Sequence, residues 1–599
     1  MKTMIRILPL FFLCTFVTNS FSQSLPILLD GKTDDWNIPV PTYIDDIGDG
    51  NIFDFKYFSV TNDEDFLFIR LNLEPENKLV EDNLLALYID GDNNTGTGVV
   101  VNGIGAELRW DFGLRAGQFF KNGTSDISFS DIKYRSLPTV TDTTYEIAIG
   151  RNVLPNGTDL LFTSSTIKIF FKDNISNGDW MPNNGELFEY SFDDTPTPPV
   201  NLIEINREDN SYLRIMNYNI LFDGLLDPAK EQYFTRILQA IQPDIICFNE
   251  FFDSDVIQVQ SKINEMLPLP NGASWNSVKL DFGNVTLSKY PITQSWAIYP
   301  DRRITASLID LPSYFNNDLM VINSHYKCCG GQSNNNTRQL EADATIAFIL
   351  DAKTSGGVID LPEYTPFIIL GDLNLVGDRQ QLTTLVTGDI INTQFFGNGG
   401  PPDWDGTELE DLIAQHTDKR TAYTWRNDNS SFPPGRLDFQ IYSNSVMSVE
   451  KSFIIQTEIM SADRLTQYGL QQFDTRNASD HFPKITDYSF IVTSVTAEDF
   501  HPMDFKLEQN YPNPFNPSTT IKFSIPNVVS SFSLRTSLMV YDVLGNEIAT
   551  LVNKELPPGR YEVTFSAGQD NFLSLNSGVY FYTLSAGSFR ETKKMILMR

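Results

Sequence analysis

The sequence predicts an α/β middle domain flanked by two β-sandwich domains, and three observations predict this class. Between residues 24 and 195, short strand-like runs alternate with Gly, Asn and Asp turns, without a long helical period. Residues 211–492 instead alternate strand-like with helical patterns. Residues 505–599 return to alternating strands separated by turn residues. The chain is therefore expected to be α/β in its centre and β-rich at both ends.

The first 22 residues are typical of a secretory signal peptide. Lys2 and Arg6 precede the apolar run Ile7–Val17, and small residues follow at Ser20 and Ser22. Such a run is too short, and wrongly flanked, to be a membrane-spanning helix. We therefore expect the mature protein to be secreted or held at the cell surface.

The mature chain is strongly acidic. The formal charge is −32, and it becomes −34 when Lys2 and Arg6 leave with the signal peptide. Such a surface repels nucleic acid and anionic membranes at long range, which argues against tight, sequence-independent coating of DNA. It leaves room for a hydrolase that meets a phosphodiester at a local, metal-neutralised site. After processing, the remaining cysteines are Cys247, Cys328 and Cys329, an odd number that argues against a disulfide scaffold.

The N-terminal sandwich, residues 24–195, is followed by a Pro-containing linker at 196–210. Its turn residues Asp90, Asp92 and Asn94 place oxygen atoms at alternate positions, as calcium loops do, although the EF-hand pattern is not completed. The competing interpretation is an ordinary Asp/Asn turn. A structural Ca²⁺ is therefore one of two readings of this loop.

Two stretches of this sandwich resemble known binding modules. Asp30-Gly31 with Asp34–Trp36, and then Leu87–Gly96, resemble the family 9 carbohydrate-binding-module-like and DOMON-like sandwiches. The resemblance implies carbohydrate as a partner. Trp36 and other tryptophans are candidates for stacking on a sugar, with core packing as the alternative.

In the middle domain, polar side chains recur where apolar strands end. The run Phe367–Leu370 stops at Gly371, and Asp372 and Asn374 follow. Polar groups at the end of a buried strand usually belong to a site, whereas a simple Asx-turn is the alternative for Asp372. The same pattern is repeated at further strand ends, namely Asn219, Glu250, His325, Asp438, Asp480 and His481.

The chemistry of this set is coherent. Glu250 can hold a hard cation through oxygen, and Asn219 can support the metal or a phosphate without adding charge. His481 suits a proton-handling or phosphate-contacting role, and Asp438 is the kind of residue that orients such a ring. Each residue alone has a structural explanation, such as a helix cap for Asp480, but their coincidence favours a catalytic site.

The series of motifs resembles the endonuclease/exonuclease/phosphatase superfamily, which includes pancreatic-type DNases, abasic-site endonucleases, inositol polyphosphate phosphatases and neutral sphingomyelinases. The resemblance implies a four-layer α/β/β/α sandwich over residues 211–492. It is carried by Asn217-Tyr218-Asn219, Phe248-Asn249-Glu250, Asn323-Ser324-His325, Gly371-Asp372-Leu373-Asn374, Arg436-Leu437-Asp438-Phe439 and Ser479-Asp480-His481.

The resemblance also implies a metal site. Glu250 would be the main ligand, Asn219 would lie nearby, and Asp480 would complete the metal environment. The expected cofactor is Mg²⁺, with Mn²⁺ as the alternative.

The same resemblance assigns catalytic roles. Asp372 would orient or deprotonate the attacking water, and Asn374 would help to place the water and the phosphate. His481, held by Asp438, would contact the scissile phosphate as acid/base or as charge stabiliser. His325 would bind phosphate or assist the leaving group.

Departures from the family pattern lie close to these motifs. Asn249 stands where the family often has Gln before the metal-binding Glu. The adjacent cysteines Cys328 and Cys329 lie shortly after His325. Three interpretations of this pair are open: a vicinal disulfide, a pair of ligands for a soft metal, or two thiols. Asn219 and Arg303 are additional candidates for contacting the substrate phosphate.

The expected function is that of a secreted, divalent-metal-dependent phosphodiester hydrolase, with an extracellular nuclease favoured. A sphingomyelinase-like enzyme or a phosphomonoesterase is the enzymatic alternative. The alternative of another class is a surface binding protein whose catalytic domain is inactive.

The C-terminal region, residues 505–599, resembles the sorting domain of the type IX secretion system. The resemblance rests on the Asn510–Pro517 stretch, the strand Ser577–Tyr582 and the basic end that begins at Lys593-Lys594. It implies the type IX machinery as a partner. An immunoglobulin-like accessory domain is the alternative.

Overall fold

The computed structural model describes residues 24–299, 301–315, 317–491, 505–525, 534–556, 559–567, 575–586 and 589–598. The predicted signal peptide, residues 1–22, lies outside this range. The chain divides into two compact units, Met1–Ile491 and Val492–Arg599. The N-terminal sandwich and the middle domain thus share one unit. In the described part of the chain, no helix is long and apolar enough to cross a membrane.

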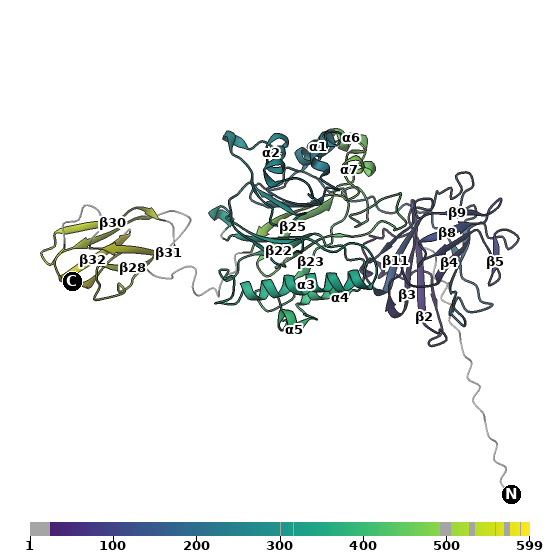
Figure 1. Cartoon of the computed structure of the whole chain (residues 1–599), viewed down its shortest axis with the longest axis horizontal. Helices are drawn as coiled ribbons and strands as arrows, with labels where there is room; N and C mark the ends of the chain where they lie inside the picture. The colour runs from purple at the N-terminus through teal and green to yellow at the C-terminus, as the bar shows by residue number, and fades with distance from the viewer. Residues whose placement is uncertain are drawn as a thin grey trace, which may run out of the picture. The chain divides into compact units, whose positions relative to one another are not determined.

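The N-terminal region is a sandwich of two antiparallel sheets (Figure 1). The first sheet consists, in spatial order, of β1 (Thr42–Ile44), β2 (Asp54–Asn62), β3 (Phe66–Asn77), β11 (Asp142–Gly150) and β10 (Arg135–Leu137). The second consists of β13 (Trp180–Met181), β12 (Thr166–Asp173), β4 (Leu85–Asp90), β7 (Leu108–Asp111), β8 (Ala116–Phe119) and β9 (Ser125–Ile127), with β14 (Glu189–Ser191) beside β12. A separate hairpin joins β5 (Val99–Val101) to β6 (Ile104–Ala106).

Alternation along β3 explains how this sandwich is covered on both faces. Leu67, Ile69 and Leu71 point into the main core between the sheets. Phe66 and Phe68 belong to a second cluster, which also contains Trp36. Because Trp36 is only 3% exposed, its ring packs in the protein rather than offering a stacking surface for a sugar. Carbohydrate binding by this domain stays a prediction.

The first sheet of the middle domain has six strands. Their order is β17 (Asn276–Val278), β18 (Val285–Ser288), β16 (Ile245–Asn249), β15 (Leu213–Asn219), β26 (Lys484–Phe490) and β25 (Met447–Ile454). Its outer face is covered by α1 (Glu231–Ile241), α2 (Val256–Met266), α6 (Ala462–Tyr468) and α7 (Asp474–Ala478) (Figure 1). Asp227 as a helix N-cap, with Pro228 at the first helical position, predicts that this helix starts at Pro228. In the structure residues 228–230 form a turn, and α1 begins at Glu231.

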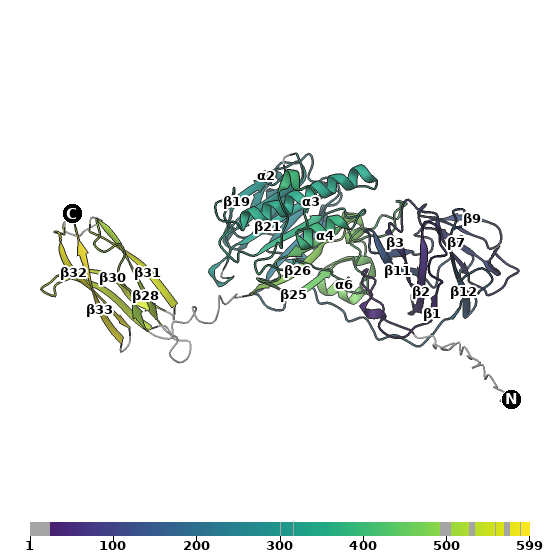
Figure 2. The ribbon, with the colours of Figure 1, turned by 90° about the horizontal axis from the view of Figure 1, so that it is seen from below.

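The second sheet also has six strands. Their order is β19 (Ile292–Ala297), β20 (Ile304–Ile309), β21 (Leu319–His325), β22 (Phe367–Asp372), β24 (Asp438–Tyr442) and β23 (Glu410–Asp411). The helices α3 (Gln332–Ala352), α4 (Gln380–Thr387) and α5 (Thr393–Phe396) lie on its side of the domain, and Figure 2 shows α3 and α4 across its strands.

The two sheets pack face to face through a shared apolar layer. Ile215 and Cys247 come from the first sheet, and Val321, Ile368 and Leu370 come from the second. Separate clusters join each sheet to its helices. The middle domain is therefore the four-layer α/β/β/α sandwich that the resemblance implies, and the fold class is confirmed.

The second unit contains two small antiparallel sheets around its own core. One sheet consists of β27 (Lys506–Leu507), β28 (Ser518–Ile525) and β31 (Gly559–Ser566). The other consists of β30 (Glu547–Leu556), β29 (Leu534–Tyr541), β32 (Gly578–Ala586) and β33 (Phe589–Leu597). This region is thus the β-rich end that the sequence predicts.

Candidate active site

The polar strand ends of the middle domain meet because neighbouring strands are in register. His325 at the end of β21 pairs with Asp372 at the end of the parallel strand β22. Asp372 in turn pairs with Asp438 at the start of the antiparallel strand β24. In the facing sheet, Asn219 on β15 pairs with Asn249 on β16, and Glu250 follows directly. Carboxyl ends of adjacent parallel strands lie at one edge of a sheet, so both sheets deliver polar groups there.

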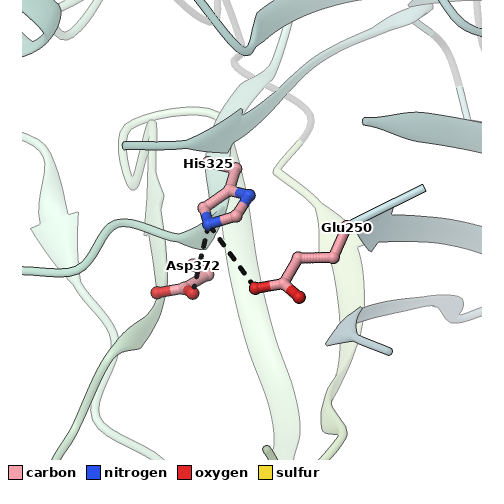
Figure 3. Close-up of side chains that lie close together, drawn as sticks. All are labelled: Glu250, His325 and Asp372. Carbon is pink, nitrogen blue, oxygen red and sulfur yellow. Dashed lines mark ion pairs between the residues drawn. The ribbon is translucent and has the colours of Figure 1, made fainter. Parts of the chain in front are cut away.

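Glu250, His325 and Asp372 form one cluster whose ligand atoms all lie within 4.8 Å of one another. His325 Nε2 lies 3.9 Å from Glu250 Oε1 and 3.6 Å from Asp372 Oδ2 (Figure 3). The Asn219 amide donates to Glu250 Oε1 at 2.9 Å and to Asp372 Oδ2 at 3.0 Å. Asn219 therefore joins the two carboxylates, which come from different sheets.

The backbone around the cluster has two unusual positions. Glu250 adopts φ 73°, in the left-handed region that is uncommon for a residue with a side chain. Gly371 has φ 122°, and a Cβ there would stand 2.1 Å from the carbonyl oxygen of Ser324 on the neighbouring strand. Only glycine allows β22 to approach β21 so closely just before Asp372.

His481 and Asp438 form the second part of the site. His481 Nδ1 lies 2.8 Å from Asp438 Oδ2, and His481 Nε2 lies 3.6 Å from Asp372 Oδ2. Burial lowers the pKa of His481, but the carboxylates of Asp438 and Asp372 outweigh burial and raise this pKa to about 10. His481 is therefore a cation at neutral pH.

The other titratable groups are shifted in ways that separate their roles. Burial lowers the pKa of His325 well below its usual range, and the charges of Arg303 and His481 lower it further, so His325 is neutral. Burial raises the pKa of Asp372 to about 7, against the influence of His481. Two buried histidines in one site thus carry different charges, a separation typical of catalytic centres.

Asn374 is held beside this cluster. Its backbone N–H donates to Asp372 Oδ1 at 3.1 Å, and its side-chain amide donates to the carbonyl of Tyr326 at 3.3 Å. The structure therefore brings Asn374, Asn219, Glu250, His325, Asp372, Asp438 and His481 to one place. Their predicted roles stay predictions.

Two of the predicted site residues are placed less directly. Asp480 Oδ2 accepts from Trp425 Nε1 at 3.1 Å and from Asn427 at 3.4 Å, and Asp480 lies outside the Glu250 cluster. The Arg303 guanidinium lies over the ring of Phe252 at 5.8 Å, while its backbone carbonyl accepts from the His325 N–H at 2.8 Å. The Arg303 backbone therefore contacts His325, and the charge of its guanidinium acts on the same residue.

Sequence reasoning singled out Asn249 only as a departure, but the structure gives it a positioning role. Asn249 Oδ1 accepts the backbone N–H of Asp372 at 2.9 Å, across the gap between the sheets. Its amide nitrogen donates to Asn284 at 2.8 Å and to Asn323 at 3.0 Å. This buried network locks the end of β22, and its signal in the sequence is the polar Asn within otherwise apolar strands.

The cysteines after His325 are free thiols, as Cys247 is. The Cys328 and Cys329 sulfur atoms lie 2.7 Å apart. Both residues line the pocket that contains Glu250, His325 and Asp372.

In the turn at residues 90–94, two of the predicted calcium-loop residues lie close to a further acid. Asp90, Asp92 and Glu107 place ligand atoms within 4.8 Å of one another. The Asn94 side chain accepts the backbone N–H of Gly96 at 3.0 Å, and its role as a ligand stays a prediction. Glu107, which sequence reasoning did not single out, directly follows the β5–β6 hairpin.

The comparisons with known proteins agree with this geometry at the level of the family. Residues 216–481 match the Endonuclease/Exonuclease/phosphatase family. Residues 509–598 match the secretion system C-terminal sorting domain. No curated protein matches the chain. The middle of this chain is therefore a domain of the endonuclease/exonuclease/phosphatase family, a hydrolase fold. The C-terminal sorting domain of the chain indicates export by the type IX secretion system to the cell surface or beyond.

Solved structures with this similarity are distant. The endonuclease/exonuclease/phosphatase from Beutenbergia cavernae DSM 12333 is 13% identical, with 64% of this chain and 100% of that chain covered and a TM-score of 0.29. ANGEL2, a 2',3'-cyclic phosphatase, is 12% identical, with coverages of 47% and 97% and a TM-score of 0.31. The AP endonuclease LMAP from Leishmania major is 12% identical, with coverages of 48% and 93% and a TM-score of 0.28.

Proposed function

We propose that this protein is a secreted, divalent-metal-dependent phosphodiester hydrolase. The observation that carries the proposal is the convergence of Glu250, Asp372 and neutral His325 with the charged His481–Asp438 pair. A carboxylate that can accept a proton, a neutral imidazole and a buried imidazolium within one pocket can activate water and stabilise the charge that develops in phosphoryl hydrolysis.

The residues present fit a hard divalent cation. Glu250 and Asp372 bring two carboxylates together, and within the described residues no Lys or Arg forms an ion pair with either of them. Glu250 would hold the cation with support from Asn219, and Mg²⁺ is the expected ion, with Mn²⁺ as its substitute. Asp480 stays a candidate for an outer position. When bound, the cation would offset the negative charge that develops on the phosphate oxygens.

The remaining steps belong to the side chains of the chain itself. Asp372 Oδ orients the attacking water and takes its proton, and Asn374 helps to fix the position of the water. The His481 imidazolium, held by Asp438, stabilises the charge on the scissile phosphate through Nε2. His325 contacts the phosphate or the leaving group, and Arg303 adds long-range positive potential.

Nucleic acid is the substrate expected from the sequence, so an extracellular nuclease is the first candidate. The second candidate is a hydrolase of a smaller phosphate ester, including sphingomyelinase-like and phosphomonoesterase activities. The observation that favours it is the largely apolar lining of the pocket that contains the site. A surface binding protein with an inactive domain is the least consistent with the complete set of catalytic groups.

One panel of assays tests the proposal. Plasmid DNA, RNA, sphingomyelin and a phosphate monoester are incubated with the wild-type chain, with and without chelator. We expect divalent-dependent hydrolysis of at least one phosphodiester, and a loss of at least about 100-fold in Asp372→Asn and His481→Ala with unchanged unfolding temperature. Turnover that survives chelator, or wild-type turnover in either variant, contradicts the proposal.

We also propose a structural Ca²⁺ site at Asp90, Asp92 and Glu107. Asp90 and Glu107 are fully buried, and Asp90 Oδ2 and Glu107 Oε1 have no hydrogen-bond partner in the described part of the chain. The Lys168 ammonium lies 3.7 Å from Asp90 Oδ2, so it offsets only part of this charge. Oxygen ligands of this kind suit Ca²⁺.

A further inference from the structure

The N-terminal sandwich forms one wall of the pocket that contains the catalytic cluster. This pocket has a volume of about 290 Å³ and reaches from Glu250, Asp372 and His481 to the sandwich. Figures 1 and 2 show β3 and β11 on the side of the sandwich that faces the middle domain. The sandwich residues that line the pocket are Leu79, Val80, Ser136, Pro138, Thr139 and Val140.

The wall is fixed by hydrogen bonds to the loop that follows β22, the strand that carries Asp372. Thr139 Oγ1 donates to the carbonyl of Leu375 at 2.8 Å, and the N–H of Thr141 donates to the carbonyl of Gly377 at 2.9 Å. Leu375 and Gly377 follow Asp372 and Asn374 by a few residues. Val140, between these two contacts, packs into the core of the middle domain. The wall is therefore positioned relative to the reacting groups.

Arg115 connects this wall to the opposite one. Its guanidinium donates to the carbonyl of Val80 at 2.8 Å and lies 4.1 Å over the ring of Phe432. Val80 and Phe432 are both half-buried and both line the pocket. Arg115 also donates to Ser431 Oγ at 3.5 Å and lies 3.6 Å from Glu81 Oε1. With these contacts it acts as a positioning residue for the slot between Val80 and Phe432.

The chemistry of the slot does not match a polyanion. Beyond the catalytic groups the lining consists mostly of aliphatic, proline and aromatic side chains, with the hydroxyls of Ser136, Thr139 and Ser430 among them, and no Lys or Arg lies among the described residues of the lining. Proteins that bind a nucleic acid backbone contact several phosphates with Lys, Arg or backbone donors. Here His481 and the expected cation can meet the charge of one phosphate, and the next part of the ligand meets apolar surface.

Three cations of a neighbouring pocket are already paired, whereas Arg303 and Lys327, whose charges lower the pKa of His325, form no ion pair in the described part of the chain. Arg426 forms an ion pair with Asp428 at 2.7 Å, and Arg476 forms one with Glu458 at 3.2 Å. Lys230 donates to the carbonyl of Ala478 at 3.1 Å. These side chains line a neighbouring pocket that shares Asp480 with the first. They do not supply a free basic track for a nucleic acid strand.

We propose that the sandwich and the middle domain together form a binding subsite for one apolar arm of a small phosphate ester. The proposal rests on the proposed function, because it places the phosphate of the ligand at the catalytic cluster. The substrate class is then a small phosphate ester that places one alkyl or aryl arm in the slot, and the lining favours such an ester over the interior of a nucleic acid duplex. Val80 and Phe432 contact the arm.

The test is the binding of methyl, butyl and hexyl phosphate to the full chain with Mg²⁺, measured by calorimetry. A fully buried methylene improves affinity about fourfold, so we expect hexyl phosphate to bind at least about tenfold more tightly than methyl phosphate. Val80→Asp should remove this dependence on chain length, because its carboxylate faces the arm. Val80→Leu should keep the increase of affinity with alkyl chain length. The matched control is Val100→Asp, at a position in the same sandwich that is 71% exposed.

The outcomes separate this inference from the proposed function. Equal affinity for the three phosphates, no binding of any of them, or unchanged length dependence in Val80→Asp overturns the subsite. A DNA duplex that displaces hexyl phosphate at lower concentration also overturns it. The affinities need no turnover, so hydrolysis in the substrate panel can fail while the subsite is supported, and the reverse can also occur.

Discussion

Replacing Asp438 by Asn tests whether the His481–Asp438 pair acts in the reaction. Asp438 is fully buried, and its Oδ2 lies 2.8 Å from His481 Nδ1. Asn keeps the size of the side chain but removes the charge that holds the imidazolium. A hydrogen bond to a charged group is worth about 1.5–3 kcal/mol, which corresponds to a loss of about 10-fold to 150-fold in kcat/KM.

The assay is the magnesium-dependent hydrolysis of bis(p-nitrophenyl) phosphate, with kcat and KM determined separately. We expect the loss mainly in kcat, because the pair stabilises charge that develops on the phosphate after binding. Asp463→Asn, the same change at an exposed position of α6, is the control. A loss of less than about threefold in Asp438→Asn, with intact folding, would refute the assignment of His481 to the phosphate.

Two further predictions concern stability. His416 is fully buried against the carbonyl of Tyr423 at 2.7 Å, and burial lowers its pKa to about 3. Between pH 6.5 and about pH 3, His416 binds a proton in the unfolded state but not in the folded state. The free energy of unfolding therefore falls as the pH falls through this range. By pH 5 the loss is about 2 kcal/mol. Between pH 7.5 and 5, the free energy of unfolding in urea should fall by about 2 kcal/mol less in His416→Phe than in the wild type. An equal fall in both proteins would contradict the reasoning. Saturating Ca²⁺ should raise the unfolding temperature of the wild type by roughly 5–10 °C. It should have no such effect on Glu107→Gln, whereas the exposed-site control Glu189→Gln should respond like the wild type.

The fold and the strand-end residues could be predicted because both are local in the sequence. An apolar run that stops at Gly371-Asp372 predicts a buried strand with a polar group at its end. The parallel pairing of β21 with β22 then places His325 beside Asp372 without any long-range information beyond strand order. For the same reason, the predicted position of Asn374 next to Asp372 agrees with the structure.

The parts that sequence reasoning missed depend on contacts between distant segments. Asn249 reaches the Asp372 backbone across two sheets, and no local pattern announces that pairing. Glu107 joins Asp90 only because a hairpin folds back over the turn. The start of α1 differs by a few residues because Pro228 is compatible with both a turn and a first helical turn.

The hydrogen bonds from Thr139 and Thr141 to the loop after β22 have a consequence for how such proteins diversify. The groups that we propose to break the ester lie in the middle domain, whereas part of the surface that we propose to select the ester lies in the N-terminal sandwich. Exchange of the sandwich between relatives would therefore change which ester is accepted while leaving Glu250, Asp372 and His481 untouched. In this chain, the N-terminal sandwich would then be an exchangeable wall of the substrate pocket.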